Sequence, residues 1–426
     1  MYKILNLIDD EQFKYRHTSG CKGFSRNRTL TFRNLIFLIS SVLTKSLQKE
    51  LNGFFAKLSN KDYSVLEVTK GALTQARAKL KHEAFIELSN LAVNEFYNNE
   101  NYRKWNGFRL LAVDGSTSNL PSHPSIKSDF GSSFTGCKQS VETSMARVSL
   151  FYDVLNFITL DATIEKSSYS ENSLLNKHLE LTELKRGDLL ILDRGYSSNA
   201  LMFELLQKGV HFCMRMRSHW HEVKDFENSN EHSRIVQFAL PRKDKHLLEK
   251  YKSDNKKITC RLVAITLDTG EKEILCTSLV DNKYTVKDIG FLYHYRWNIE
   301  EAYKLLKVRM QLSNYSGKTS NAVKQDFFAK IFMMNICAIM SFPIEEKLIK
   351  ENRNREMKYK VNKTNAISTL KESWVALWIK NKIKRVLIAF DDILLRAKEM
   401  IRPNRKFERK KFKYPDIKPA QPYKRI

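Results

Sequence analysis

The sequence predicts a mixed α/β protein, in which a sheet with helices on its faces carries a β-rich insertion and follows an all-helical N-terminal domain. Three observations support this prediction. Apolar residues recur at intervals of three and four over residues 1–105, strand-like apolar runs begin at about residue 106, and helical and strand-like segments alternate after that. The predicted organisation is a helical domain at 1–105, a first part of the sheet core at 106–216, the β-rich insertion at 217–283, the last part of the core at 284–345, a helical region at 346–401 and a flexible basic tail at 402–426.

The first 105 residues are expected to form a helical bundle with its own core. One apolar stripe has helical spacing and consists of Phe32, Leu35, Ile36, Ile39, Val42, Leu43 and Leu47. A second helix is expected over Lys70–Lys81, with Thr69 as its N-cap and basic residues along its length. A recognition helix in a DNA groove and a solvated basic face on an ordinary helix explain this second pattern equally well.

Two predicted core strands end in an aspartate. The apolar run Phe108–Val113 leads into Asp114, and the run Asp188–Leu192 leads into Asp193. At the carboxyl ends of neighbouring strands, such side chains emerge together above a sheet. The remaining elements predicted for this part of the core are strands at 146–152, 157–164 and 210–216 and helices at 173–184 and 199–208.

The insertion contains a hairpin signal. Ile258–Leu267 and Glu273–Leu279 read as two strands joined by the turn Asp268-Thr269-Gly270. Trp220 lies between His219 and His221, and this alternation is a weak signal for a metal site without further ligands.

The segments after the insertion are predicted to be helical. Thr285 and Asp288 fit a capping box for a helix that runs to about Lys307. Val323–Phe342 is apolar on nearly all sides, which predicts a core helix. Arg402–Ile426 is rich in lysine, arginine and proline, and we expect a flexible arm that becomes ordered on a phosphate backbone.

The charge of the chain points to a polyanionic partner. Lysine and arginine number 73 against 47 acidic residues, which gives a net charge of +26. Nucleic acid is the first candidate, and a basic protein on a membrane surface is the alternative. Neither an amphipathic anchor nor a lipidation signal is visible, so the sequence predicts no membrane partner.

The sequence also predicts a cytoplasmic location. The longest apolar run, Leu35–Leu43, is about half as long as the ~20 residues that a membrane span needs. Met1–Asp10 has no signal-peptide pattern. The cysteines are far apart and form no CxxC pair, so we expect reduced, structural thiols at Cys21, Cys137, Cys213, Cys260, Cys276 and Cys337.

A third carboxylate is expected on the helix after the insertion. At 100° per residue, Tyr293, Arg296, Glu300 and Lys307 fall on one face. Three carboxylates gathered by folding suit Mg²⁺, which supports cleavage of DNA phosphodiesters. A salt-bridged surface helix would show the same spacing, so this pattern alone does not decide between the two interpretations.

The motifs themselves resemble a known family. Tyr293 to Lys307 fits Tyr-(2)-Arg-(3)-Glu-(6)-Lys, the signature of DDE transposases of the insertion-sequence-4 family. The family's Asp-Gly-Ser/Thr motif is matched at Asp114, and its apolar-Asp-Arg-Gly-Tyr motif at Asp193. The resemblance is firm over residues 106–340 and looser in the N-terminal region, through Gln75-Ala76-Arg77.

This resemblance implies a fold and a function. The catalytic core is expected to be RNase H-like, and Asp114, Asp193 and Glu300 are expected to be catalytic and to bind Mg²⁺, with Mn²⁺ as a substitute. The expected partners are double-stranded DNA, as terminal inverted repeats and target, and a second copy of the chain in a synaptic complex near the nucleoid. Excision with or without a DNA hairpin fits the sequence. The expected DNA contacts are Tyr293, Arg296, Trp297, Lys307 and Arg77.

Several alternatives remain open at this level. Trp297 stacking on a DNA base and Trp297 packed on the core are equally compatible with the motif, and Trp220 is a weaker candidate for stacking. An RNase H-like nuclease without strand transfer and a non-catalytic DNA-binding regulator of transposition are the competing functions.

Overall fold

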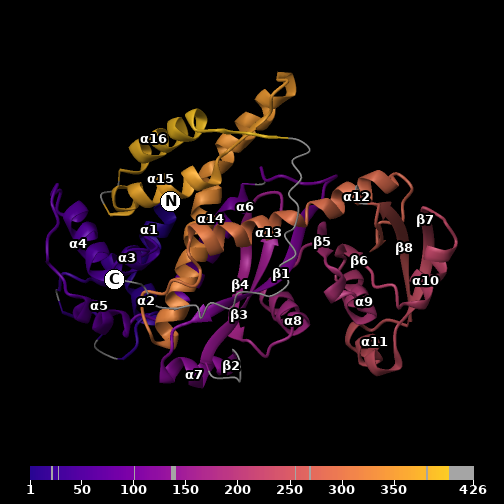
Figure 1. Ribbon diagram of the computed structural model, residues 1–426, viewed down its shortest axis with the longest axis horizontal. Helices are drawn as coiled ribbons and strands as arrows, with labels where there is room; N and C mark the ends of the chain where they lie inside the picture. The colour runs from indigo at the N-terminus through magenta and orange to yellow at the C-terminus, as the bar shows by residue number, and fades with distance from the viewer. Residues whose placement is uncertain are drawn as a thin grey trace.

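The computed structural model describes residues 1–20, 23–26, 28–99, 101–135, 141–254, 256–267, 270–379 and 382–402 (Figure 1). The molecule is elongated. Helices of the N-terminal region lie at one end, the strands and helices of the predicted insertion lie at the other, and the main sheet lies between them (Figure 1). The predicted arm from Pro403 onward, the turn residues Asp268 and Thr269, and Cys21 and Cys137 lie outside the described residues.

The N-terminal region is helical, as predicted, but the prediction that it has its own core is wrong: Phe32 and Leu35 belong to the same buried cluster as Leu110 of the sheet and Phe327. The apolar stripe from Phe32 is divided between two helices, because Val42 takes a positive φ of 56° and interrupts it. Thr69 is an N-cap, since its hydroxyl accepts from the Ala72 N–H at 3.2 Å, but the helix it caps ends at Arg77. The helices are α1 (Tyr2–Ile8), α2 (Glu11–Arg16), α3 (Phe32–Ser40), α4 (Leu47–Leu58), α5 (Lys70–Arg77) and α6 (Glu83–Asn98).

One mixed sheet forms the centre of the protein. Its first strand, β1, pairs antiparallel with β3 and parallel with β5, and β4 pairs with the other edge of β3. β6 continues the sheet parallel to β5. The strands of this part are β1 (Arg109–Leu120), β2 (Ser133–Thr135), β3 (Val141–Asp153), β4 (Ile158–Lys166), β5 (Asp188–Leu192) and β6 (His211–Arg215).

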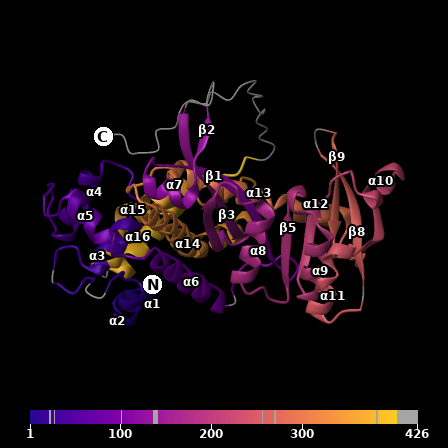
Figure 2. The ribbon, with the colours of Figure 1, turned by 90° about the horizontal axis from the view of Figure 1, so that it is seen from below.

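Helices cover the faces of this sheet. Helix α8 (Glu171–Leu181) packs beside β3, β4 and β1, and α9 (Asn199–Gln207) connects β5 to β6 (Figure 2). Helix α7 (Pro124–Phe130) follows β1. All of β5 is buried, because helices and loops shield both of its faces from water.

A buried ion pair fixes the register of β1 against β5. Arg109 donates two hydrogen bonds to Asp188, at 2.8 and 2.7 Å, and both side chains are almost fully buried. These residues are the first pair of the two strands, and the register continues to Ala112 opposite Ile191. A slip by one residue would leave both charges unpaired in the interior, which is strongly unfavourable.

The segment 217–283 extends the main sheet. Strand β9 (Lys272–Thr277) pairs antiparallel with β6, and β8 (Lys257–Thr266) and β7 (Ser233–Ala239) follow it to the edge. The β8–β9 pair is the predicted hairpin. The segment also contains helices α10 (His221–Asn228) and α11 (His246–Tyr251), so it is mixed in composition.

The C-terminal part is helical and packs over the sheet. The predicted capping box is present: Thr285 accepts from the Asp288 N–H, and the Asp288 carboxylate accepts from the Thr285 N–H. The elements are α12 (Val286–His294), α13 (Trp297–Lys304), a π-helical turn at Leu305–Arg309, α14 (Ser320–Glu351), β10 (Tyr359–Lys360), α15 (Lys363–Trp378), α16 (Ile383–Arg396) and β11 (Glu399–Met400).

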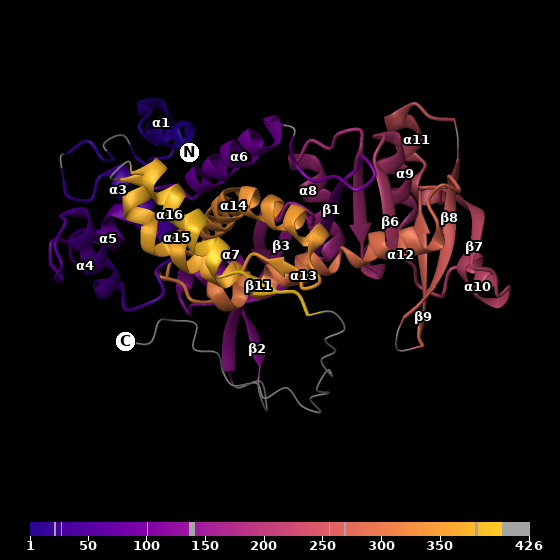
Figure 3. The ribbon, with the colours of Figure 1, turned by 90° about the horizontal axis from the view of Figure 1, so that it is seen from above.

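Helix α14 is the predicted core helix. It lies between the N-terminal helices and the sheet, in contact with α6, α3 and β4 (Figure 3). Asn335 exchanges two hydrogen bonds with the backbone of Thr159 in β4. The helical stretch Ser320–Asn354 is long and apolar enough to cross a membrane, yet 72% of its most apolar window is buried inside the protein. This burial is typical of a core helix. Four of the cysteines, Cys213, Cys260, Cys276 and Cys337, are buried free thiols.

Candidate active site

Asp114 and Asp193 stand at the same level of the sheet. Ala112 pairs with Ile191 in parallel register, so two residues further along each chain bring Asp114 and Asp193 opposite one another. Strand β5 ends at Leu192, whereas β1 continues to Leu120 with β3 as its only partner. The sequence predicted that Asp114 ends its strand. Instead, Asp114 lies within β1 at the point where its neighbour β5 stops.

The backbone at Asp114 is held firmly. Its carbonyl accepts from the Tyr303 hydroxyl at 2.7 Å and from the Ser149 hydroxyl at 3.2 Å. Its carboxylate accepts from the Gly115 N–H at 2.8 Å. The Ser149 hydroxyl lies 2.9 Å from Nε2 of the buried His178. Helix α13, strand β3 and helix α8 therefore all help to position this aspartate.

Asp193 is the N-cap of a short 3-10 turn, Arg194–Tyr196. Its carboxylate accepts from the Arg194 N–H at 2.6 Å. The side chain is half-buried, at the end of a strand that is wholly apolar after Asp188. The fold thus leaves the carboxylate accessible while the strand behind it is fixed in the core.

Glu300 comes from helix α13, which packs on β1 through Tyr303. The helix predicted to run to Lys307 is divided: α12 ends at His294, and α13 begins after Tyr295 and Arg296, nearly in line with it (Figure 1). Arg296 pairs with Glu300 at 2.8 Å, and the charges of Glu300 and Asp193 both act on its guanidinium. We call Asp114, Asp193 and Glu300 the acidic cluster.

The electrostatics of Asp114 reflect this crowding. Burial raises the pKa of its carboxyl group to about 6, and the charges of Glu300 and Glu171 act in the same direction. The Gly115 N–H and Arg296 oppose the increase. Negative charge is therefore concentrated at a half-buried position, where a cation would stabilise it.

The donors at the acidic cluster are all carboxylate oxygens, which suit hard divalent cations such as Mg²⁺ and Mn²⁺. Within the described ranges, no three acidic, histidine or cysteine side chains stand close enough to form a metal site as they are arranged. Arg296 holds Glu300, and Arg147 pairs with Glu171 at 3.2 Å. In this arrangement, these two guanidinium groups balance part of the negative charge of Glu300 and Glu171.

The other residues of the Tyr-Arg-Glu-Lys pattern differ in exposure. Tyr293 is buried, and the Arg296 guanidinium lies 5.7 Å from the centre of its ring. Trp297 is 41% exposed, with the same guanidinium 5.8 Å from its ring. Lys307 is exposed on the π-helical turn, an element that often occurs at functional sites. Trp297 and Lys307 are thus exposed to solvent, whereas the buried ring of Tyr293 packs against the guanidinium of Arg296.

The structure does not support the predicted DNA contact by Arg77. Its side chain is only 5% exposed and forms an ion pair with Asp326 at 2.9 Å. It also donates to Gln325, Ser316 and the carbonyl of Ala322. Arg77 therefore joins α5 to the start of α14, and the family-like Gln-Ala-Arg pattern has a structural explanation.

The histidines of the insertion form no metal site with one another. His221 begins α10, and its nearest acidic partner is Asp225 at 3.6 Å. Trp220 is the N-cap residue of that helix and packs edge-on against Phe238. A helix start, with the tryptophan turned to the core, explains the alternating pattern.

Sequence reasoning missed Glu171 and Arg147, and it named Tyr196 only as the last residue of the Asp-Arg-Gly-Tyr motif, without a role. The sequence predicted that α8 begins at about Ser173, whereas Ser170 caps it and Glu171 is its first residue. An acidic residue in a first helical turn is common, because it favours the helix dipole. No sequence signal therefore distinguishes Glu171 from an ordinary helix start.

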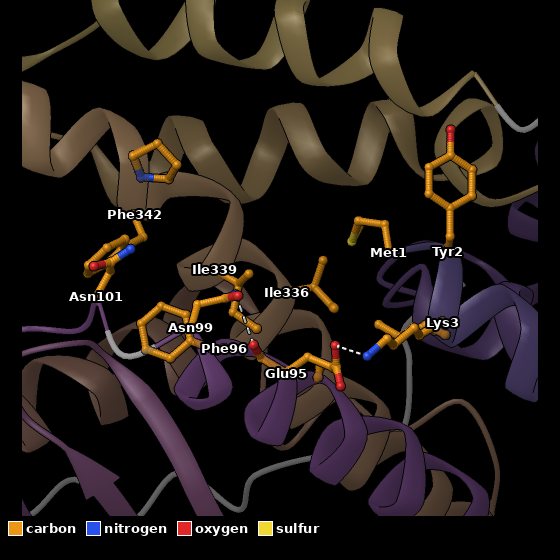
Figure 4. A pocket seen from close by; sticks show the side chains of 13 residues that line it. Met1, Tyr2, Lys3, Glu95, Phe96, Asn99, Asn101, Ile336, Ile339 and Phe342 are labelled. Carbon is orange, nitrogen blue, oxygen red and sulfur yellow. Dashed lines mark hydrogen bonds and ion pairs between the residues drawn. The ribbon is translucent and has the colours of Figure 1, made fainter.

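A cavity at the helical end of the molecule lies away from the acidic cluster. It has a volume of about 710 Å³ and lies where α1, α6 and α14 meet, with Met1, Phe96, Ile336 and Phe342 in its wall (Figure 4). None of the predicted site residues lines it. This cavity is therefore separate from the acidic cluster.

Comparisons with known proteins identify the family of the chain. A family model described as "Transposase DDE domain" matches residues 105–336. The transposase of insertion sequence element IS4 from Escherichia coli K12 is 24% identical over 290 residues, 66% of this chain and 63% of the relative. The chain thus matches less than two thirds of that relative's length. The transposase of element IS231B from Bacillus thuringiensis subsp. berliner is 20% identical over 350 residues, 71% of this chain and 70% of that one.

Among solved structures, a piggyBac transposase in a synaptic complex with hairpin DNA gives a TM-score of 0.47 at 10% identity, covering 92% of this chain and 84% of that one. The family match spans more than half of the chain and contains Asp114, Asp193 and Glu300. The chain belongs to the DDE transposase family, with relatives among the transposases of IS4-type insertion sequences.

Proposed function

We propose that the protein is the transposase of a bacterial insertion sequence, which excises and inserts the element by metal-dependent DNA cleavage and strand transfer. One observation carries the proposal: parallel strands β1 and β5 carry Asp114 and Asp193 at opposite positions, and Glu300 on α13 lies close enough for its charge to act on Asp114. Family membership points to the same activity.

The proposed catalytic core is RNase H-like. What supports this is the strand order β4-β3-β1-β5-β6, in which β3 alone runs against the others. The sequence predicted three early strands, then a helix and alternating elements, and this order along the chain is compatible with the same core.

Mg²⁺, with Mn²⁺ as a substitute, is the proposed cofactor, and Asp114, Asp193 and Glu300 would hold it. The oxygen-only donor set and the raised pKa of Asp114 support this fit. When bound, a pair of such cations would activate the attacking oxygen and stabilise the leaving one.

The surrounding residues have roles that follow from their positions. Arg296 would leave Glu300 and pair with DNA phosphates, for which a guanidinium is well suited. Exposed Lys307 would bind phosphate, and exposed Trp297 would stack on a base. Tyr293 would act through Arg296, since its own ring is buried beneath the guanidinium.

The proposed partners are double-stranded DNA, as terminal inverted repeats and target, and a second copy of the chain in a synaptic complex. The net charge of +26 supports a polyanionic partner. The proposed location is the bacterial cytoplasm, at the nucleoid.

Incubation of the protein with its element's ends and a target plasmid tests this proposal. We expect Mg²⁺-dependent cleavage and joined products, both absent in Asp114→Ala, which should still bind the ends. Asp129→Asn is the matched control, because Asp129 is an exposed carboxylate on α7. Cleavage without joining would indicate a nuclease, and binding without cleavage in either Mg²⁺ or Mn²⁺ would indicate a non-catalytic regulator.

A further inference from the structure

A fourth carboxylate lies beside the acidic cluster. Glu171 is the first residue of α8, and this helix contacts both β1 and the Arg194–Tyr196 turn that follows β5. The start of α8 thus lies beside the chain segments that carry Asp114 and Asp193.

Two glycines make room for the Glu171 side chain. A Cβ atom built at Gly115 would lie 3.4 Å from Oε1 of Glu171, and one built at Gly195 would lie 3.5 Å from Oε2. Gly115 follows Asp114 directly, and Gly195 lies just beyond Asp193. The two oxygens of Glu171 therefore face the two chain segments that carry the paired aspartates.

A buried hydroxyl group in the same place lacks a partner. The Tyr196 side chain is 2% exposed, and its hydroxyl has no hydrogen-bond partner within the part of the chain that the structure describes. Apart from burial, the charges of Glu171, Asp114 and Asp193 are the main influences that raise the pKa of Tyr196. A buried hydroxyl without an acceptor is costly, which indicates that a further group belongs beside these carboxylates.

Arg147 on β3 lies beside Glu171, and only part of its guanidinium group has a hydrogen-bond partner in the described ranges. Its guanidinium pairs with Glu171 at 3.2 Å, while its buried Nε has no partner among the described residues. Arginine donates five hydrogen bonds, so this geometry leaves much of its capacity unused. The ion pair can therefore be replaced by two other interactions. A cation would take the place of Arg147 beside Glu171, and a phosphate would take the place of Glu171 beside Arg147.

We propose that Glu171 is a fourth carboxylate of the acidic cluster, which binds a divalent cation there and releases Arg147 when it does so, with Tyr196 as a positioning residue. This inference rests on the proposed function. Each of two cations a few Å apart takes several oxygen ligands, from carboxylates, water and phosphate, and Glu171 would contribute one of them. The Tyr196 hydroxyl would donate to a carboxylate or water that becomes ordered in the loaded site.

Mn²⁺ binding to the full-length protein without DNA, measured by calorimetry, tests the inference. We expect Glu171→Gln to weaken Mn²⁺ binding by about tenfold or more, or to remove one of two bound ions. Glu180→Gln is the control, because Glu180 lies on the opposite, exposed face of α8 and loses the same charge. We expect it to bind as the parent does.

Arg147→Gln separates a cation ligand from an ordinary ion pair. If Glu171 alternates between Arg147 and the cation, removing the arginine removes a competitor, so Mn²⁺ binding becomes tighter. Weaker binding in Arg147→Gln would contradict the inference, since the ion pair itself would then be what the site requires.

Tyr196→Phe tests the positioning role through melting temperature. Removing a hydroxyl without a partner should leave the melting temperature of the metal-free protein unchanged or raise it. The increase that Mn²⁺ produces should become smaller than in the parent. An unchanged increase would contradict this role.

The outcomes distinguish the two proposals. If the parent binds Mn²⁺ and joins DNA ends while Glu171→Gln behaves as Glu180→Gln, the inference is wrong and the proposed function stands. If the parent neither binds Mn²⁺ nor cleaves DNA, the proposed function fails and this inference fails with it.

Discussion

Two arginines that the sequence marked for DNA contact differ completely in their surroundings. Arg77 is buried and donates to four different residues, including the carboxylate of Asp326. Arg296 makes one ion pair with Glu300, and its buried Nε has no partner among the described residues. A guanidinium with satisfied donors stabilises the fold, whereas one with unused donors beside clustered carboxylates can change partner when a substrate arrives.

The largest expected effect is on stability, at Arg77. Arg77→Met leaves the buried Asp326 carboxylate without its ion-pair partner, so we expect the free energy of unfolding to fall by about 3–5 kcal/mol. Urea unfolding measures this. Arg77→Met combined with Asp326→Leu should lose less than the single variant, because neither member of the ion pair is then left without the other. If Arg77→Met lowers the free energy of unfolding by less than about 1 kcal/mol, Arg77 does not have the structural role that distinguishes it from Arg296.

Arg296 should show the opposite pattern. Arg296→Gln removes a contact with DNA phosphates, so we expect cleavage to fall about 100-fold, equivalent to about 2.7 kcal/mol. The free energy of unfolding should change by less than about 1 kcal/mol, because the ion pair with Glu300 is partly exposed. Cleavage assays and urea unfolding on the same preparation give both numbers. A large loss of stability would place Arg296 in the same class as Arg77.

The carboxyl groups of Asp326 and Asp114 should affect stability in opposite directions as pH changes. Burial acts to raise the pKa of Asp326, but Arg77, Lys330 and Ser316 together lower it below 3.8, so its stabilising contribution is present at neutral pH and is lost as pH falls below about 4. The pKa of Asp114 is instead raised to about 6, so ionising it costs stability as pH rises from about 4 through 6.

Asp114→Asn should therefore stabilise the metal-free protein at pH 8, by roughly 1–2 kcal/mol after allowance for solvent screening, while it abolishes cleavage. Melting with a chelator at pH 4 and pH 8 measures this, and the gain should be confined to the higher pH. An equal gain at both values would show that charge is not the cause.

The smallest expected effect is at Lys307. Lys307→Gln should weaken binding to DNA ends about threefold to tenfold and reduce the slope of log affinity against log salt by about 1, because one phosphate contact is lost. Lys304→Gln is the control, since Lys304 is exposed on α13 but pairs with Glu301. Equal effects in both variants would mean that the region contributes only general positive charge.

Local signals in the sequence predicted local structure well. The capping box at Thr285, the N-cap at Thr69 and the β8–β9 hairpin are all present, because each depends on residues a few positions apart. The two strands that carry Asp114 and Asp193 were also predicted, since β5 is an unbroken apolar run and β1 starts as one.

Errors arose where distant segments decide the structure. The extension of β1 beyond Asp114 depends on pairing with β3, and the break between α12 and α13 and the π-helical turn depend on packing against the sheet. The strands of segment 217–283 join the main sheet because β9 pairs with β6, which no local pattern reveals.

By itself, the sequence determined the type of the elements with clear periodicity, the basic character of the chain, and the identity of three acidic residues whose motifs match a family. Periodicity, capping and motif spacing are short-range properties, so they can be read from neighbouring residues. Only the tertiary structure decided that Arg77 has four hydrogen-bond partners whereas Arg296 keeps an unused donor within the described part of the chain, and that Glu171 and Tyr196 lie beside the acidic cluster. Burial and partners are properties of segments brought together by folding, and they determine whether a charged side chain is structural or free to act.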